Sequence, residues 1–176
     1  MKHLIILATL SLMGCKKSEL MNTRPFAAEK ISQTASFIID ENITLVFPLF
    51  DAFEERKWEP SWNPKLIYPE TEVIEVGTTF SIDGDNKEPS CLWRVIQFDP
   101  ASYFIQYFVS TRHRDWTISV KCESEAENTQ TKVSVTYTFI GLTPEGNELN
   151  RTHINQMYQQ DLQDWKQAID NYLFAS

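Results

Sequence analysis

Residues 131–140, TKVSVTYTFI, alternate between polar and apolar side chains from Lys132 to Phe139. One face of this segment carries Val133, Val135, Tyr137 and Phe139, and the other carries lysine, serine and threonine. A period of two predicts a β-strand with one buried face and one face in water, as is typical of antiparallel sheets. Residues 115–122 repeat the pattern, so we expect both strands in one sheet that has a single apolar face.

Six runs earlier in the chain also have the length and composition of strands, and turn signals such as Asp83–Asn86 and Asp99-Pro100 separate some of them. Two short helices are expected after the first strand. One would start at Thr44 as its N-cap and break at Pro48, and the other would span Asp51–Glu59. The predicted strands are Thr34–Ile39, Leu66–Tyr68, Val73–Val76, Thr78–Ile82, Cys91–Phe98 and Tyr103–Val109.

The end of the chain changes from a period of two to the spacing of a helix. Apolar residues recur three or four positions apart, and the opposite face is rich in glutamine and asparagine. A long amphipathic helix is therefore predicted, and it is the natural cover for the apolar face of the sheet. Its apolar face comprises Ile154, Met157, Tyr158, Leu162, Trp165, Ala168, Ile169, Tyr172 and Leu173.

The N-terminus has the three parts of a secretory signal peptide: a basic head, an apolar run and a small residue before a cysteine. The last four residues, Leu12-Met13-Gly14-Cys15, resemble a bacterial lipobox. In lipoproteins of that family the cysteine thiol receives a diacylglycerol, and cleavage follows the glycine. We therefore expect 1–14 to be a lipoprotein signal peptide and 15–33 to be a tether. The alternatives are an ordinary signal peptide or a hydrophobic cytosolic N-terminus.

The formal net charge is −8, which disfavours nucleic acid as a partner because phosphate backbones would be repelled. Anionic lipid surfaces would be repelled as well, so membrane attachment is expected to rest on the acyl chains of Cys15. Lys16 follows this cysteine, where enterobacterial lipoproteins retained in the inner membrane carry Asp. The expected location is the bacterial cell envelope, with the outer membrane favoured over the inner.

The order of these elements, and the amino-acid sequences of several segments, resemble those of the START-like superfamily (SRPBCC; polyketide cyclase/dehydrase-like). That resemblance implies an α+β helix-grip fold over 34–176, in which a curved antiparallel sheet of seven strands wraps around a long C-terminal helix. Two short helices follow the first strand. The resembling segments are Ile43–Trp62, Gly77–Phe80, Trp93–Pro100, Thr131–Leu142 and Gly146–Leu173.

The implied topology also bears on the two remaining cysteines. Cys91 begins one predicted strand, and Cys122 ends the next strand but one, which runs in the same direction. The two residues would lie at opposite ends of the sheet, whereas a disulfide requires α-carbons within about 7 Å. We expect two buried thiols.

Few residues have the pattern of catalytic or metal-binding groups. We expect no metal and no cofactor, because the chain lacks phosphate-binding and dinucleotide motifs and neither His113 nor His153 has a second ligand at metal spacing. Both histidines are interpreted as solvated surface residues. Glu54 and Glu55 are the candidate acid/base groups. The favoured interpretation is that they form the solvated face of a short helix while Trp58 is buried in the core, because charged residues are mostly exposed.

The resemblance implies a cavity between sheet and helix, and it leads to three hypotheses. The preferred function is binding of a hydrophobic small molecule or lipid by a lipid-anchored protein. The second is a cyclase, dehydratase or hydrolase acting on an aromatic or polyketide-like substrate. The third is a non-catalytic envelope interaction module with a filled core and an exposed apolar patch near Trp58 and Trp62. The expected cavity-lining residues are Trp58, Trp62, Trp93, Tyr103, Tyr107, Trp116, Tyr137, Tyr158 and Trp165.

Overall fold

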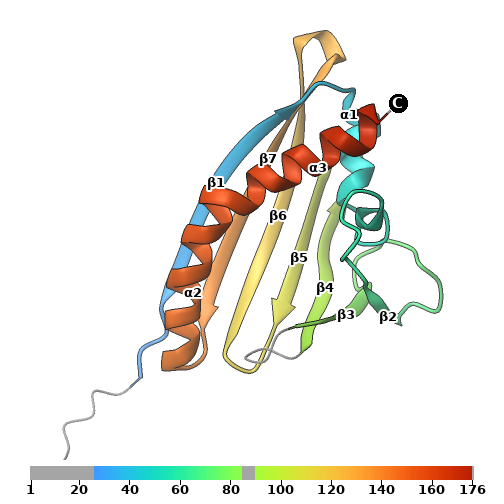
Figure 1. The fold of residues 1–176 in the computed structure, drawn as a ribbon. Coiled ribbons are helices and arrows are strands. Elements are labelled where there is room, and N and C mark those ends of the chain that lie inside the picture. The colour runs from blue at the N-terminus through green and yellow to red at the C-terminus, as the bar shows by residue number, and fades with distance from the viewer. Residues whose placement is uncertain (1–25, 85–89, 176) are drawn as a thin grey trace, which may run out of the picture.

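Seven antiparallel strands form one curved sheet in the computed structural model, which describes residues 26–84 and 90–175. The strand order is β1-β7-β6-β5-β4-β3-β2, and a long C-terminal helix crosses one face of the sheet (Figure 1). The predicted α+β architecture is confirmed. The strands are β1 (Lys30–Ile39), β2 (Lys65–Tyr68), β3 (Thr79–Asp83), β4 (Ser90–Asp99), β5 (Phe104–Ser110), β6 (Arg114–Glu125) and β7 (Gln130–Gly141).

Strands β6 and β7 show the predicted alternation. Every second residue from Trp116 to Cys122, and from Val133 to Phe139, is buried, while the residues between them are partly exposed. The register pairs Ile118 with Tyr137, so the apolar faces of the two strands lie on the same side of the sheet. Both strands therefore present one continuous apolar surface toward the helix.

One predicted strand is absent from the structure, and the first strand begins earlier than predicted. Val73–Val76 is not a strand, because the Thr78 hydroxyl holds this segment as a loop: it donates to the carbonyl of Val73 at 2.9 Å and accepts from the amide of Glu75 at 3.0 Å. The first strand begins at Lys30 rather than at Thr34, so its first four residues come from the stretch predicted as tether. Those residues pair with the end of β7.

The short helices after β1 are less regular than predicted. Helix α1 spans Ile43–Val46, and its N-cap is Asn42 rather than Thr44, because the Asn42 side chain accepts from the Thr44 amide at 2.8 Å. The chain continues as a 3-10 helix over Phe47–Phe50 that contains Pro48. The second predicted helix, Asp51–Glu59, is a series of turns with a single 3-10 segment at Glu55–Lys57.

The C-terminal helix is longer than its apolar pattern indicates. It comprises α2 (Pro144–Gln156), a π-helical turn (Met157–Asp161) and α3 (Leu162–Phe174). Its N-cap is Thr143, whose hydroxyl accepts from the Gly146 amide at 3.0 Å, and proline follows in the first turn, where its missing N–H costs nothing. The first ten residues, 144–153, contain few apolar side chains, so hydrophobic periodicity gave no signal there.

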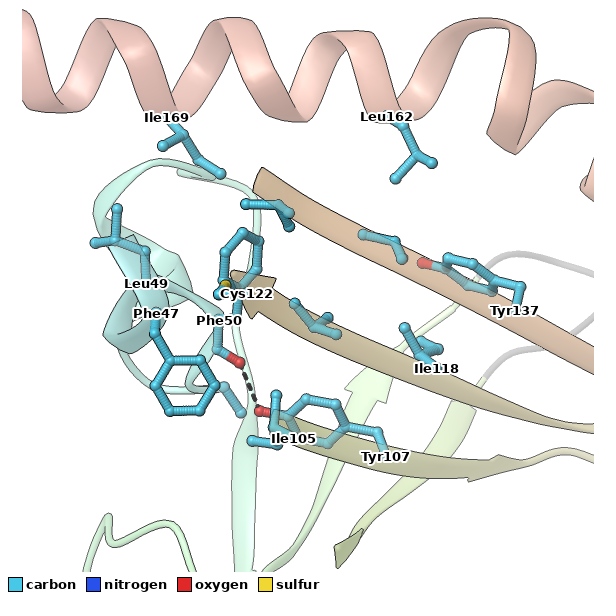
Figure 2. Close-up of a cluster of buried hydrophobic side chains, with 14 of the residues drawn as sticks. Phe47, Leu49, Phe50, Ile105, Tyr107, Ile118, Cys122, Tyr137, Leu162 and Ile169 are labelled. Atoms are coloured by element: carbon cyan, nitrogen blue, oxygen red, sulfur yellow. Dashed lines mark hydrogen bonds between the residues drawn. The ribbon is translucent and has the colours of Figure 1, made fainter. Parts of the chain in front are cut away.

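The core lies between the helix and the sheet, and the short helices cover one end of it (Figure 2). Leu162 and Ile169 project from α3 toward strand residues such as Ile118, and Leu49 and Phe50 approach from the 3-10 helix. No disulfide joins Cys91 and Cys122, as predicted, but only Cys122 is buried; Cys91 is half-buried, so the prediction of a buried thiol is wrong there. Burial raises the pKa of the Cys122 thiol to about 12, so it is chemically quiet.

Replacing Ile169 with alanine tests the contact between helix and sheet. Ile169 has no solvent exposure, so Ile169→Ala is expected to lower the free energy of unfolding by about 2–5 kcal/mol in urea titrations. Gln163→Ala, at an exposed position of the same helix, should change it by less than about 0.5 kcal/mol. Equal effects of the two variants would mean that the helix does not cover the sheet as described.

Candidate functional site

A cavity of about 230 Å³ lies between the C-terminal helix, the inner face of the sheet and the segment that follows α1. Rings make up most of its wall, and a single carboxyl group interrupts them. Its lining consists of Phe50, Glu55, Trp62, Trp93, Tyr107, Trp116, Ile118, Val120, Tyr137, Phe139, His153, Met157 and Trp165.

The aromatic wall is held together by edge-to-face contacts. Trp93 stands edge to face with Trp62, Tyr107 and Trp116, at ring-centroid distances of 5.2, 5.9 and 6.5 Å. Its other neighbour, Phe80, stacks against it at 5.8 Å. Such contacts contribute about 0.5–1.5 kcal/mol beyond the burial of area, and they fix the orientation of each ring. The wall is therefore built from rings that hold one another in place.

Three ring side chains are anchored to the backbone of one short segment. The indole of Trp58 donates to the carbonyl of Leu49 at 2.7 Å, and the indole of Trp62 donates to that of Ala52 at 2.7 Å. Between these two, the Tyr107 hydroxyl donates to the carbonyl of Phe50 at 2.8 Å (Figure 2). The carbonyls at the end of a short helix lack partners within it, so these rings satisfy groups that would otherwise be buried without a hydrogen bond.

Glu55 is the carboxyl group of the cavity. No residue that the structure describes donates a hydrogen bond to either of its carboxyl oxygens. Its side chain keeps an intermediate exposure because it borders the cavity, yet burial raises its pKa well above the ordinary value of 4.5. Repulsion from Glu59 and then from Asp51 raises it further. An apolar cavity with one unpartnered carboxyl is suited to bind a hydrogen-bond donor or to transfer a proton.

The neighbouring carboxylates have partners elsewhere. Glu54 lies outside the cavity lining and forms an ion pair with Lys57. Asp51 accepts from the amide of Phe53 at 2.7 Å, and Glu59 accepts from the amide and hydroxyl of Ser61 at 3.0 and 2.5 Å. Of the two predicted acid/base candidates, the structure thus brings only Glu55 to the cavity. The favoured interpretation, a wholly solvated face, is wrong for Glu55.

Two further polar groups of the cavity wall lack a partner in the described part of the chain. The hydroxyl of Tyr137 has none, and burial followed by the charge of Glu55 raises its pKa well above 10.0, which keeps it protonated as a donor. The indole Nε1 of Trp93 is buried without an acceptor. A ligand could therefore meet a few polar groups among many apolar ones, the usual composition of a small-molecule site.

An arginine and a histidine adjoin another part of the wall. The guanidinium of Arg114 lies over the rings of Trp116 and Phe139, at 4.8 and 5.5 Å from their centroids. It also lies 2.9 Å from Nδ1 of His153, toward which it can only donate, because a guanidinium has no acceptor. Sequence reasoning gave Arg114 no role and interpreted His153 as a solvated surface residue. The structure differs on both points, since Arg114 is only 4% exposed and His153 lines the cavity.

His113 was also interpreted as solvated, but it is partly buried. Its Nδ1 lies 3.1 Å from the Thr143 hydroxyl, the cap of the long helix, and 3.6 Å from the carboxylate of Glu145. In residues 26–84 and 90–175, no three His, Cys, Asp or Glu side chains are arranged to hold a metal ion. None of the helices described there is long and apolar enough to cross a membrane. Cys15 and the predicted signal peptide lie outside the described residues.

Six of the nine predicted lining residues meet at the cavity: Trp62, Trp93, Tyr107, Trp116, Tyr137 and Trp165. The other three lie elsewhere. Trp58 is buried behind Trp165, 5.7 Å between ring centroids, and Tyr103 packs edge to face on Phe47 at 5.7 Å. The Tyr158 hydroxyl reaches past the core to the β1–β7 pair, where it accepts from the Tyr137 amide at 3.1 Å.

Sequence reasoning missed Phe50 and His153 as lining residues. His153 lies four residues before Met157, so helical spacing puts these two residues on one face. This signal was present, but it required the helix to begin earlier than predicted. Phe50 gave no such signal, because it follows Pro48 in an irregular segment.

The comparisons with known proteins concern the fold. No protein-family model and no curated protein matches the chain. Solved structures do match it. Norcoclaurine synthase from Thalictrum flavum superposes with a TM-score of 0.63 at 11% identity, over 97% of this chain and all of that one. This chain has the helix-grip fold.

Two other solved structures agree. Major latex-like protein 151 from Panax ginseng matches with a TM-score of 0.57 at 12% identity, over 81% of this chain and 97% of its own. An uncharacterised protein from Rhizobium leguminosarum matches with a TM-score of 0.59 at 16% identity, over 85% and 98%. At such identities the likeness establishes the helix grip and leaves the chemistry of the cavity to be argued from its own residues.

The raised pKa of Glu55 predicts a pH-dependent effect on stability. The folded protein favours the protonated carboxyl, so the stability that this group contributes is complete below pH 4.5 and is lost as the pH rises through the raised value. Glu55→Gln should therefore raise the melting temperature by a few degrees at pH 8, where 1 kcal/mol corresponds to about 2–4 °C, and by much less near pH 4.5.

Glu54→Gln is the matched control for this measurement. It removes the adjacent carboxylate, which is outside the cavity lining, and should not raise the melting temperature at either pH. A Glu55→Gln variant that is no more stable than the wild type at pH 8 would contradict the burial of this carboxyl.

Proposed function

We propose that this protein binds a small hydrophobic molecule in the cavity between its helix and its sheet. The observation that carries the proposal is a pocket of about 230 Å³ between the helix and the sheet that is partly open to solvent and walled mostly by rings. Protein interiors otherwise contain few voids larger than a water molecule. A cavity of this size therefore requires an explanation other than imperfect packing.

Apolar walls make water a poor occupant. A water molecule needs two to four polar partners, and a few polar groups cannot serve the roughly eight molecules that such a volume would hold at about 30 Å³ each. Apolar cavities of about 150 Å³ already bind benzene. A fused bicyclic or similar ligand would fit here, and its desolvation would supply most of the binding free energy.

Filling the cavity from the sheet tests this proposal. Ile118 lines it, and its neighbour Thr117 lies on the opposite face of β6. Isothermal titration with 3-propylindole, a neutral apolar probe, is expected to show binding to the wild type and to Thr117→Trp. Ile118→Trp should bind at least tenfold more weakly, because the larger ring occupies the volume of the ligand. Equal affinities for all three proteins would contradict the cavity as the binding site.

The protein is also proposed to be anchored in the bacterial envelope by acylation of Cys15, with the outer membrane favoured. The support is the lipobox-like Leu12-Met13-Gly14-Cys15 after an apolar run that is too short to span a bilayer, which needs about 20 residues. An anchored binding domain would hold its ligand next to a lipid surface.

Cys15→Ser tests the anchor. In a bacterial host, the wild-type protein should fractionate with membranes and yield an acylated N-terminal cysteine by mass spectrometry. The serine variant should show neither the mass of the acyl group nor cleavage after Gly14. A wild-type protein that carries an unmodified Cys15 would exclude the anchor while leaving the cavity proposal intact.

An acid/base enzyme is the second candidate, and the position of Glu55 is the observation that favours it. A carboxyl with a raised pKa beside a protonated tyrosine has the properties of a general acid or base. The interaction-module alternative required a filled core and an exposed apolar patch around Trp58 and Trp62. Trp58 is 4% exposed and Trp62 lines the cavity, so this alternative lacks support.

A further inference from the structure

We infer that the ligand of this cavity carries a protonated amine, for which the Glu55 carboxylate is the counter-ion inside the aromatic wall. The inference rests on the proposed function and names the chemical class of the ligand. It starts from the contrast between Glu55, which has no hydrogen-bond donor among the described residues, and its neighbours, which have partners outside the cavity.

An unpartnered carboxyl at an apolar surface is costly, and a core residue of the same size would avoid the cost. The protein has cations close to Glu55 in sequence, but Lys57 pairs with Glu54 and Arg56 pairs with Glu72 at 2.6 Å. Both ion pairs are exposed, on the outer side of the segment. Neither of these two basic residues therefore forms an ion pair with the carboxyl of Glu55 that faces the cavity.

The charges around Glu55 favour a cation. Asp51 and Glu59 lie one helical turn before and after it, and both repel its negative charge. From the strands, the titratable side chains that its charge reaches are Tyr107 on β5 and Tyr137 on β7. Both phenols are held protonated by burial, so neither supplies a charge. An anionic ligand group would be repelled here, whereas an ammonium group would relieve the repulsion.

The surrounding rings suit a cation as well. Aromatic faces attract ammonium groups, by about 2 kcal/mol or more where water is excluded. The guanidinium of Arg114 already covers Trp116 and Phe139, with His153 as its hydrogen-bond partner. Tyr107 and Tyr137 are the cavity rings that Glu55 influences electrostatically. Arg114 is not part of the cavity lining, so the carboxyl of Glu55 is the group on the wall that a ligand cation complements.

Proton balance gives this inference a signature. Before binding, Glu55 favours its protonated form, and pairing with an ammonium group favours the carboxylate. Binding of the protonated amine therefore releases a proton from Glu55 to solvent, so the affinity should rise with pH until Glu55 is ionised. It should fall again only when the free amine itself loses its proton. A neutral ligand should show the opposite dependence and bind best at low pH, where Glu55 is uncharged.

The test compares tryptamine with 3-propylindole, which has a methyl group in place of the ammonium. Isothermal titration at pH 6–9, in two buffers with different ionisation enthalpies, measures both affinity and protons released. For the wild type at pH 8, tryptamine is expected to bind at least tenfold more tightly than 3-propylindole, and it should release protons over the part of the pH range in which Glu55 of the free protein is protonated. Glu55→Gln should abolish this preference while retaining 3-propylindole binding, and Glu54→Gln should behave as the wild type.

The outcomes separate this inference from the proposed function. If the wild type and Glu55→Gln both bind 3-propylindole and tryptamine has no advantage in either, the amine inference is overturned and the cavity remains a binding site. If the wild type binds neither probe, the proposed function fails and the inference fails with it. A preference for tryptamine that survives in Glu55→Gln would assign the ammonium group to a partner other than Glu55 and would also overturn the inference.

Discussion

A single helix has to cover the apolar face of a seven-stranded sheet that is much wider than the helix. The rest of the structure follows from this difference in width. Strands lie about 4.8 Å apart, so seven of them span about 29 Å, whereas a helix with its side chains is about 10–12 Å wide. Curvature of the sheet reduces the difference but does not remove it (Figure 1). The uncovered part of the inner face must meet other side chains, and here it meets large rings and the segment that follows α1.

That segment is also the source of the polar group in the cavity. Its helical structure is short and irregular, so it leaves backbone carbonyls at Leu49, Phe50 and Ala52 that accept from Trp58, Tyr107 and Trp62. These bonds fix the segment against the sheet. The next turn of the chain then presents Glu55 to the cavity, while its neighbours Glu54 and Arg56 form exposed ion pairs. Anchoring of the rings and placement of the carboxyl are thus two consequences of one local conformation.

The sequence was informative where periodicity is strong. Alternation in residues 115–122 and 131–140 predicted the central strands, and the spacing from Ile154 to Leu173 predicted the helix that covers them. Prediction from the sequence failed where hydrogen bonds from side chains to the backbone determine the local structure. The Thr78 hydroxyl holds Val73–Val76 as a loop, and the Thr143 cap starts a helix whose first turns have almost no apolar residues. The direction of Glu55 depends on an irregular 3-10 turn, for which sequence gives no periodic signal.

The most direct test of a ligand-binding cavity is a crystal structure of the protein purified from its own host, without an added ligand. The expectation is electron density for an apolar molecule between Trp93, Tyr107 and Trp165, with its polar end toward Glu55. It would be contradicted by an interior in which those rings have moved together and the space of about 230 Å³ is filled by the protein's own side chains.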